Sequence, residues 1–232
     1  MLNRWKCRGL NGLELKDNRE ENSLRDFGHI GKQIIDIASL FYSRGWLFGT
    51  SGNLSAVLNE TPLRIAITGS GLNKGKLDLS GLIAIDGDGN IIKGNKKVSS
   101  EADLHIAVIR EMHAGSVFHT HSIWSTMISR RFLKDGGIVI GGYEMLKGLD
   151  SVRTHEHSEW IPIIENSQDM KTLSATVTVL LREHPEIHGF MLSGHGLYTW
   201  GKTIEEAERH VEVMEFLLEV FGRSMTGTDN IV

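Results

Sequence analysis

Apolar residues recur at helical spacing near both ends of the chain. After Ser23, which suits a helix N-terminus, they fall at positions 24, 27, 30, 34, 37 and 41, and Gly45 suits the end of this helix. Towards the other end, Thr203 and Glu206 form a capping box ahead of apolar positions 204, 207, 211, 214, 217 and 221. The pattern therefore predicts two amphipathic helices. Residues 1–22 are polar and without a period, and we expect them to form a loose extension.

Between these helices, short apolar segments are separated by turn signals. Strands are expected at 54–58, 63–68, 82–85, 91–92, around 119, and at 138–140, 160–164, 189–192 and 197–200. Further helices are expected over about 99–115, from 123, and over about 169–183. Several strand pairs are joined by short turns, which favours a mixed or antiparallel central sheet covered by helices. Without repeats or linkers, residues 23–232 are expected to form a single α/β domain.

The composition is that of an ordinary globular protein. Of 232 residues, 40% are hydrophobic and 23% are charged, and a net charge of −4 without a basic tract gives no indication of nucleic-acid binding. The single cysteine, Cys7, excludes an intrachain disulfide framework and a cysteine-based zinc site. No apolar run is long enough to span a membrane, and no signal-peptide pattern is present. We therefore expect a cytoplasmic protein without a membrane or nucleic-acid partner.

A pair of histidines in one predicted strand is the first indication of chemistry. Side chains two residues apart on a strand point to the same side, so His119 and His121 can reach one metal ion. A later glycine-flanked turn can supply His195, and three neutral histidines with an open position are typical of a catalytic zinc site. Coincidence is the alternative, because the chain has 11 histidines and a second pair, His155 and His157, lies in a polar run that we interpret as a solvated loop.

Two glycine-rich loops and one helix start predict an anion site. The loops are Gly-Thr-Ser-Gly-Asn at 49–53 and Thr-Gly-Ser-Gly at 68–71, and Ser99 and Ser100 open a predicted helix. Small residues let backbone N–H groups approach a phosphate, and a helix N-terminus adds unpaired N–H groups. Lys74 adds a nearby positive charge. Ordinary turns are the alternative for each loop, and neither is a P-loop or a dinucleotide fingerprint.

Taken together and in this order, these motifs resemble the class II aldolase family of zinc enzymes, whose members act on phosphorylated sugars. The segments that carry the resemblance are 50–53, 68–71, 99–101, 119–121 and 194–196. It extends over about residues 24–223 and implies a single-domain three-layer α/β fold. Segments 142–148, 161–166 and 195–201 are similar to the family's dehydratases of methionine salvage. The resemblance therefore implies dehydration of a phosphorylated ketose.

The resemblance also implies roles for individual residues. His119, His121 and His195 would hold one zinc ion per subunit, and Glu144 would be the general acid or base. The residues implied at the substrate and its phosphate are Ser51, Gly52, Asn53, Thr68, Gly69, Ser70, Lys74, Ser99, Ser100 and Glu101. Glu101 takes the position of the aldolases' catalytic glutamate, where some dehydratases have cysteine, so its role stays open. The family generally forms homotetramers with sites at subunit boundaries, which we expect here.

Three alternatives accompany these expectations. A class II aldolase or a 4-epimerase would use the same metal and phosphate sites with different acid and base groups. A non-catalytic interaction module, as in the adducin head, would not need to keep the metal ligands. From its segment alone, Glu144 is also interpreted as a carboxylate that stabilises the first turn of a helix. The histidines interpreted as structural or solvated are His105, His113, His184, His188 and His210.

Overall fold

A nine-stranded sheet forms the centre of the protein. The computed structural model describes the backbone of residues 12–226 and the side chains of residues 27–225. The strands lie in the order β4-β3-β2-β1-β5-β9-β8-β7-β6, and all neighbours are antiparallel except β7 and β8. Their bounds are β1 Asn53–Glu60, β2 Leu63–Thr68, β3 Leu82–Asp86, β4 Ile91–Lys93, β5 Ser116–Thr120, β6 Gly137–Gly141, β7 Ser158–Ile164, β8 Gly189–Leu192 and β9 Gly196–Gly201. The expected mixed sheet is therefore confirmed.

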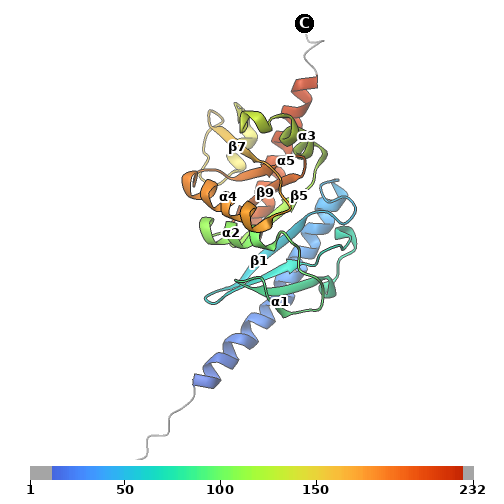
Figure 1. Ribbon diagram of the computed structural model, residues 1–232, viewed down its shortest axis with the longest axis vertical. Helices are drawn as coiled ribbons and strands as arrows, with labels where there is room; N and C mark the ends of the chain where they lie inside the picture. Colours follow the sequence, from blue (N-terminus) through green and yellow to red (C-terminus); the bar gives the residue numbers. More distant parts are fainter. Residues whose placement is uncertain (1–11, 227–232) are drawn as a thin grey trace, which may run out of the picture.

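Helices cover both faces of this sheet (Figure 1). The α-helices are α1 Gly12–Ser43, α2 Ala102–Met112, α3 Ile123–Arg131, α4 Met170–Glu183 and α5 Ile204–Thr226. Short 3-10 helices are η1 Lys74–Lys76, η2 Leu79–Gly81, η3 Leu133–Asp135 and η4 Glu144–Gly148. In β5, Val117 packs in the cluster that contains α2 and α4, whereas its neighbour Phe118 packs with α1 and α5. Alternation along the strand thus produces the expected three layers.

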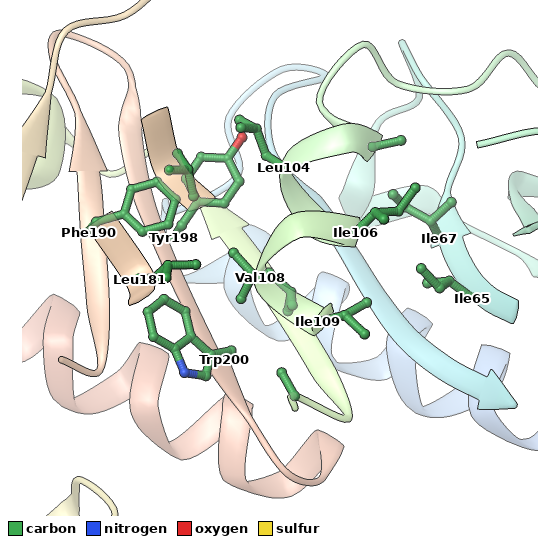
Figure 2. Close-up of a cluster of buried hydrophobic side chains, with 14 of the residues drawn as sticks. Ile65, Ile67, Leu104, Ile106, Val108, Ile109, Leu181, Phe190, Tyr198 and Trp200 are labelled. Carbon is green, nitrogen blue, oxygen red and sulfur yellow. The ribbon is translucent and has the colours of Figure 1, made fainter. Parts of the chain in front are cut away.

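The core between the sheet and α2 is shown in Figure 2. Ile106 and Ile109 of α2 lie beside Ile67 and Ile65 of β2, and all four side chains are at most 6% exposed. On the other side of α2, the rings of Phe190 and Tyr198 stack with centroids 5.0 Å apart. Burial of each large apolar side chain contributes about 1.5–3 kcal/mol, so this layer fixes α2 firmly against the sheet.

The first helix is longer than the sequence predicts. α1 begins at Gly12, eleven residues before Ser23, so part of the segment expected to be a loose extension is helical. Its added segment is rich in leucine, lysine, arginine and glutamate, which favour helix, but it is polar and gives no apolar period. In Figure 1 these first turns project away from the sheet. Residues 1–11 lie outside the described part, and a domain boundary at residue 23 stays a prediction.

The other helix ends follow the expected chemistry with one exception. Gly45, at φ 78°, lies two residues after the end of α1, and the Glu206 N–H donates to Thr203 Oγ1 at 3.2 Å. α2 begins later than the serines at 99 and 100 because its N-cap residue is Glu101, which has no capping side-chain hydrogen bond. The Glu101 side chain is thereby left for other contacts.

Candidate active site

The end of β5 places two of the predicted metal ligands. His119 is paired with Asn53 on β1 and with Tyr198 on β9, and its ring stacks on the Tyr198 ring with centroids 3.9 Å apart. His121 follows the strand, and its backbone N–H donates to the Trp46 carbonyl at 2.8 Å. Both imidazoles thus extend from backbone that the sheet and the loop after α1 hold in place.

His195 arrives from the turn between β8 and β9. Gly194 in this turn has φ 65°, which a residue without Cβ adopts at no cost, and a Cβ on Gly196 would collide with the Thr120 carbonyl. The Thr126 hydroxyl donates to the His195 carbonyl at 3.0 Å. The two glycines therefore let this turn approach the end of β5 closely enough for His195 to join the other histidines.

The three imidazoles and the Glu101 carboxylate converge on one point. One ligand atom from each of Glu101, His119, His121 and His195 lies within 4.8 Å of the others. The His119 Nε2 is 2.7 Å from the Nε2 of His121 and 3.4 Å from that of His195, and Glu101 Oε1 is 3.0 Å from His195 Nε2. Since the His119 Nδ1 faces the Leu197 carbonyl at 2.9 Å, it carries the proton and leaves Nε2 free to ligate.

The electrostatics of this cluster suit a cation. Burial lowers the pKa of His121 to about 4 and also holds the pKa of His119 well below its ordinary value, so both are in the neutral form that binds metals. Burial alone would raise the pKa of Glu101, but its contacts with His195 and the charge interaction with His119 hold that pKa below its usual range. Three imidazoles, two of them held neutral by burial, beside one ionised carboxylate fit a divalent ion such as zinc.

Asn53 links the carboxylate of this cluster to α2. Its amide nitrogen donates to Glu101 Oε2 at 2.5 Å and to Ser99 Oγ at 3.2 Å, while its Oδ1 contacts His105 Nε2. The other ring nitrogen of His105 lies 2.7 Å from Ser55 Oγ. The amide of Asn53, expected at the substrate phosphate, is thus fully engaged within the protein.

The residues predicted to hold phosphate lie in three loops that the structure brings together. Thr68 Oγ1 accepts from the Leu54 N–H at 3.2 Å, which joins the 68–71 loop to β1. The Ser70 N–H donates to the Lys97 carbonyl at 2.9 Å, and Asn53 bonds to Ser99, which joins both loops to the start of α2. The other predicted members of these loops are Ser51, Gly52, Gly69 and Ser100. Phosphate binding by this group stays a prediction.

Lys74 is the cation of this region. Its side chain is 1% exposed, and its ammonium donates to the carbonyls of Thr50 at 3.2 Å and Leu72 at 2.9 Å. Burial lowers the pKa of Lys74 to about 8, and the charge on Glu101 opposes that shift. The lysine therefore connects the 49–53 loop electrostatically to the carboxylate of the histidine cluster.

Glu144 is the predicted site residue that the fold does not bring to this cluster. It begins η4, and its carboxylate pairs with Lys147 at 2.5 Å and His155 at 3.4 Å on the surface. η4 follows Gly141, which pairs with Ser158 at the start of β7, whereas the other end of β7 pairs with β8 just before His195. Seven strand residues span roughly 20 Å. Within one chain, Glu144 therefore lies beyond the opposite end of β7 from the metal ligands.

Two buried polar residues near the cluster were missed by sequence reasoning. His105, interpreted as structural, is one helical turn after Glu101, a spacing that places both on one face of α2. Glu215 of α5 is 2% exposed and accepts a hydrogen bond from the Thr120 hydroxyl at 2.5 Å. The i, i+4 spacing could have indicated His105, but no sequence signal connects Glu215 to a strand 95 residues away.

Comparison with known proteins gives a consistent picture. A family model described as "Class II Aldolase and Adducin N-terminal domain" matches residues 32–221. A protein from Sorangium cellulosum named methylthioribulose-1-phosphate dehydratase is 36% identical over 199 residues, which cover 85% of this chain and 93% of the relative. A protein of the same name from Hahella chejuensis is 39% identical over 196 residues, which cover 84% of this chain and 93% of that relative.

Solved structures share the fold. The structure described as YgbL, a putative aldolase/epimerase/decarboxylase from Escherichia coli, superimposes with a TM-score of 0.72 at 24% identity and covers 89% of this chain and 93% of its own. Because its identity is low, it supports the architecture alone.

None of the helices in the described part of the chain has an apolar stretch sufficient to span a membrane.

Proposed function

Because the chain belongs to the class II aldolase and adducin N-terminal domain family, we propose that it dehydrates 5-methylthioribulose 1-phosphate to 2,3-diketo-5-methylthiopentyl 1-phosphate. The chain is an enzyme of the lyase class, to which dehydratases such as its named relatives belong. The observation that carries the proposal is the convergence of three imidazoles and Glu101 within 4.8 Å. The reaction would serve methionine salvage in the cytoplasm.

The proposed cofactor is one zinc ion per subunit, held by His119, His121 and His195. A divalent ion there would act as a Lewis acid on the ketose carbonyl, which makes the neighbouring C3 proton easier to remove. The loops around Asn53, Thr68 and Ser99, with Lys74 behind them, would hold the phosphate. Binding of this remote group places C3 correctly and so contributes to the rate.

Glu144 is proposed as the general acid or base, acting in the site of a neighbouring subunit. Its side chain is 69% exposed and lies at the far end of β7 from the ligands of its own chain. A homotetramer with sites at subunit boundaries would bring this exposed carboxylate to a second chain's metal. Proton transfer by a positioned carboxylate is worth about 10²–10⁴-fold in rate.

A second candidate is a class II aldolase or 4-epimerase, favoured by one observation. Glu101 lies 3.0 Å from His195 within the cluster, at the position where aldolases carry their catalytic glutamate. A non-catalytic module is disfavoured because the complete ligand set is present, with His119 buried and the other three residues partly buried.

The deciding assay supplies purified, zinc-loaded protein with methylthioribulose 1-phosphate and follows diketone formation. Diketone formation is the expected result. Cleavage of fuculose 1-phosphate without any diketone would refute the dehydratase and leave the aldolase.

The shared site has its own test. His121→Ala and Glu144→Gln subunits are each expected to be inactive, and unfolding and reassembling them together should restore activity. With random assembly, a site needs an intact His121 from one chain and an intact Glu144 from the next, so about a quarter of sites are complete. If the mixture stays inactive while both variants assemble, Glu144 does not act across subunits.

A further inference from the structure

His105 is linked through Asn53 to the Glu101 carboxylate of the histidine cluster. It is on α2, one turn after Glu101, and is completely buried. Its ring stands edge-on to Tyr198 with centroids 5.9 Å apart, and Tyr198 in turn stacks on His119. None of its atoms belongs to the metal-ligating set. Yet both of its ring nitrogens face polar partners, Ser55 Oγ and Asn53 Oδ1.

The chemistry of the partners fixes the direction of each hydrogen bond. Because an ionised carboxylate only accepts, the Asn53 group that faces Glu101 Oε2 at 2.5 Å must be the NH₂. The Asn53 oxygen then faces His105, so the imidazole must donate from Nε2. Its Nδ1 therefore accepts from the Ser55 hydroxyl at 2.7 Å. The result is one chain in which each group donates towards Glu101.

The reverse direction is unfavourable. If the Asn53 amide turned over, its oxygen would lie 2.5 Å from Glu101 Oε2, and two acceptors would face each other in a buried site. An imidazole that donates from Nε2 prevents this flip. A flipped Asn53 amide would place its NH₂ against the His105 Nε2–H, so two donors would face each other. Burial lowers the pKa of His105 to about 4, so the ring is the neutral tautomer that this chain requires.

We propose that His105 is a positioning residue that locks the Asn53 amide, so that this amide holds Glu101 Oε2 and keeps Oε1 directed at the metal site. This inference rests on the proposed metal site but not on the identity of the substrate. Oε1 is 3.0 Å from His195 Nε2 and 3.7 Å from His119 Nε2, so a rotated carboxylate would leave the cluster with an altered donor set. Mutation of a residue that orients a group at a metal site typically lowers metal affinity or activity by about 10–100-fold.

The test compares variants that keep or remove the donor. His105→Leu and His105→Phe fill the space without an N–H, whereas His105→Gln keeps a donor. Zinc affinity is measured by competition with a chelator, and kcat is measured on the loaded enzyme. We expect the two donor-free variants to lose about 10–100-fold in zinc affinity or in kcat. The glutamine variant should stay within a few-fold of the parent protein.

His210→Leu is the matched control. His210 is also a buried histidine with both nitrogens engaged, by the Trp200 carbonyl at 2.7 Å and the Asp150 N–H at 3.0 Å, but it contacts no member of the cluster. Its loss should lower stability and leave zinc affinity unchanged.

A double-mutant cycle separates positioning from packing. In an Asn53→Ala background there is no amide to lock, so His105→Leu should cause no further loss of zinc affinity. A further tenfold loss there would overturn the proposal, as would parental affinity and kcat in His105→Leu. Failure of both donor-free variants to fold while His105→Gln folds would assign the residue to the core instead. Zinc affinity needs no substrate, so an inactive but zinc-binding parent would refute the function and leave this test intact.

Discussion

Replacing Glu215 by glutamine should stabilise the protein, and more so as the pH rises. Glu215 is buried beside β5, the strand that carries His119, and its Oε1 accepts from the Thr120 hydroxyl. Its Oε2 has no hydrogen-bond partner among the described residues. Burial raises the pKa of Glu215 from 4.5 to about 7, although hydrogen bonds from Ser122 and Thr120 oppose this. The folded chain therefore holds this proton more tightly than the unfolded chain.

The sign and size follow from proton linkage. Between pH 4.5 and 7 the unfolded chain has released the proton and the folded chain keeps it, so stability falls as pH rises through this window and levels off above it. A pKa difference of about 2.5, from 4.5 to about 7, corresponds to about 3 kcal/mol at pH 8 as an upper value. Glutamine is neutral at every pH, so Glu215→Gln removes this dependence.

Urea unfolding of both proteins at pH 5 and pH 8, at one protein and one zinc concentration, measures the effect. The stability of the variant relative to the parent should be greater at pH 8 than at pH 5 by up to about 2–3 kcal/mol, because part of the effect is already present at pH 5. Any constant cost of the amide cancels in this comparison. Glu212→Gln, at a partly exposed position of the same helix, should show no comparable change. Equal relative stability at both pH values would refute a buried, protonated Glu215.

Three further changes have definite expected outcomes. Burial lowers the pKa of His188, but the hydrogen bond and the charge of the buried Glu159 outweigh burial and raise that pKa. The stabilising contribution of His188 is therefore present below pH 6.5 and is lost as the pH rises above that value. The Tm of the parent should fall more than that of His188→Gln between pH 6 and 9. The Tyr198 hydroxyl is buried without a hydrogen-bond partner among the described residues, so Tyr198→Phe should leave the free energy of unfolding unchanged or raise it by about 1 kcal/mol in urea titrations. His121→Ala should abolish turnover and weaken zinc binding while circular dichroism stays that of the folded protein, and chelation of the metal from the parent should reproduce the loss until zinc is restored.

The order of strands and helices could be predicted wherever apolar period and turn chemistry agree. The strand at 63–68 occurs as predicted, and the Thr203 hydroxyl accepts from the Glu206 N–H as an N-cap should. The start of α1 could not be found, because a polar helix that projects from the body has helix-forming residues but no buried face to give a period. The start of α2 was placed early, because a serine pair suits a cap whether or not its hydroxyls are used.

The candidate site was predictable to the extent that its geometry is local. The two-residue spacing of His119 and His121 predicts that both can reach one ion, and the glycines around His195 allow a tight turn. The His195 turn meets this strand because β5 pairs with β9. No single motif encodes that pairing, and only the order of motifs that resembles the family implies it. The hydrogen bonds of His105 and Glu215 depend on how α2 and α5 rest on the sheet. Residues of this kind look structural in a sequence because their partners are set by packing.

Glu144 shows why the spatial arrangement changes the interpretation of a residue that the sequence identifies. Its segment suggests either a helix-start carboxylate or a catalytic acid, and η4 satisfies the first description with an exposed ion pair to Lys147. An exposed pair of this kind is screened by solvent and contributes little to stability, so fold stability alone gives little reason for a glutamate there. The same exposure leaves the carboxylate available to another chain, whereas the partly buried Glu101 is engaged by residues of its own chain. The two acidic residues thus differ in whether a subunit can use them alone, and the mixed-subunit experiment measures that difference.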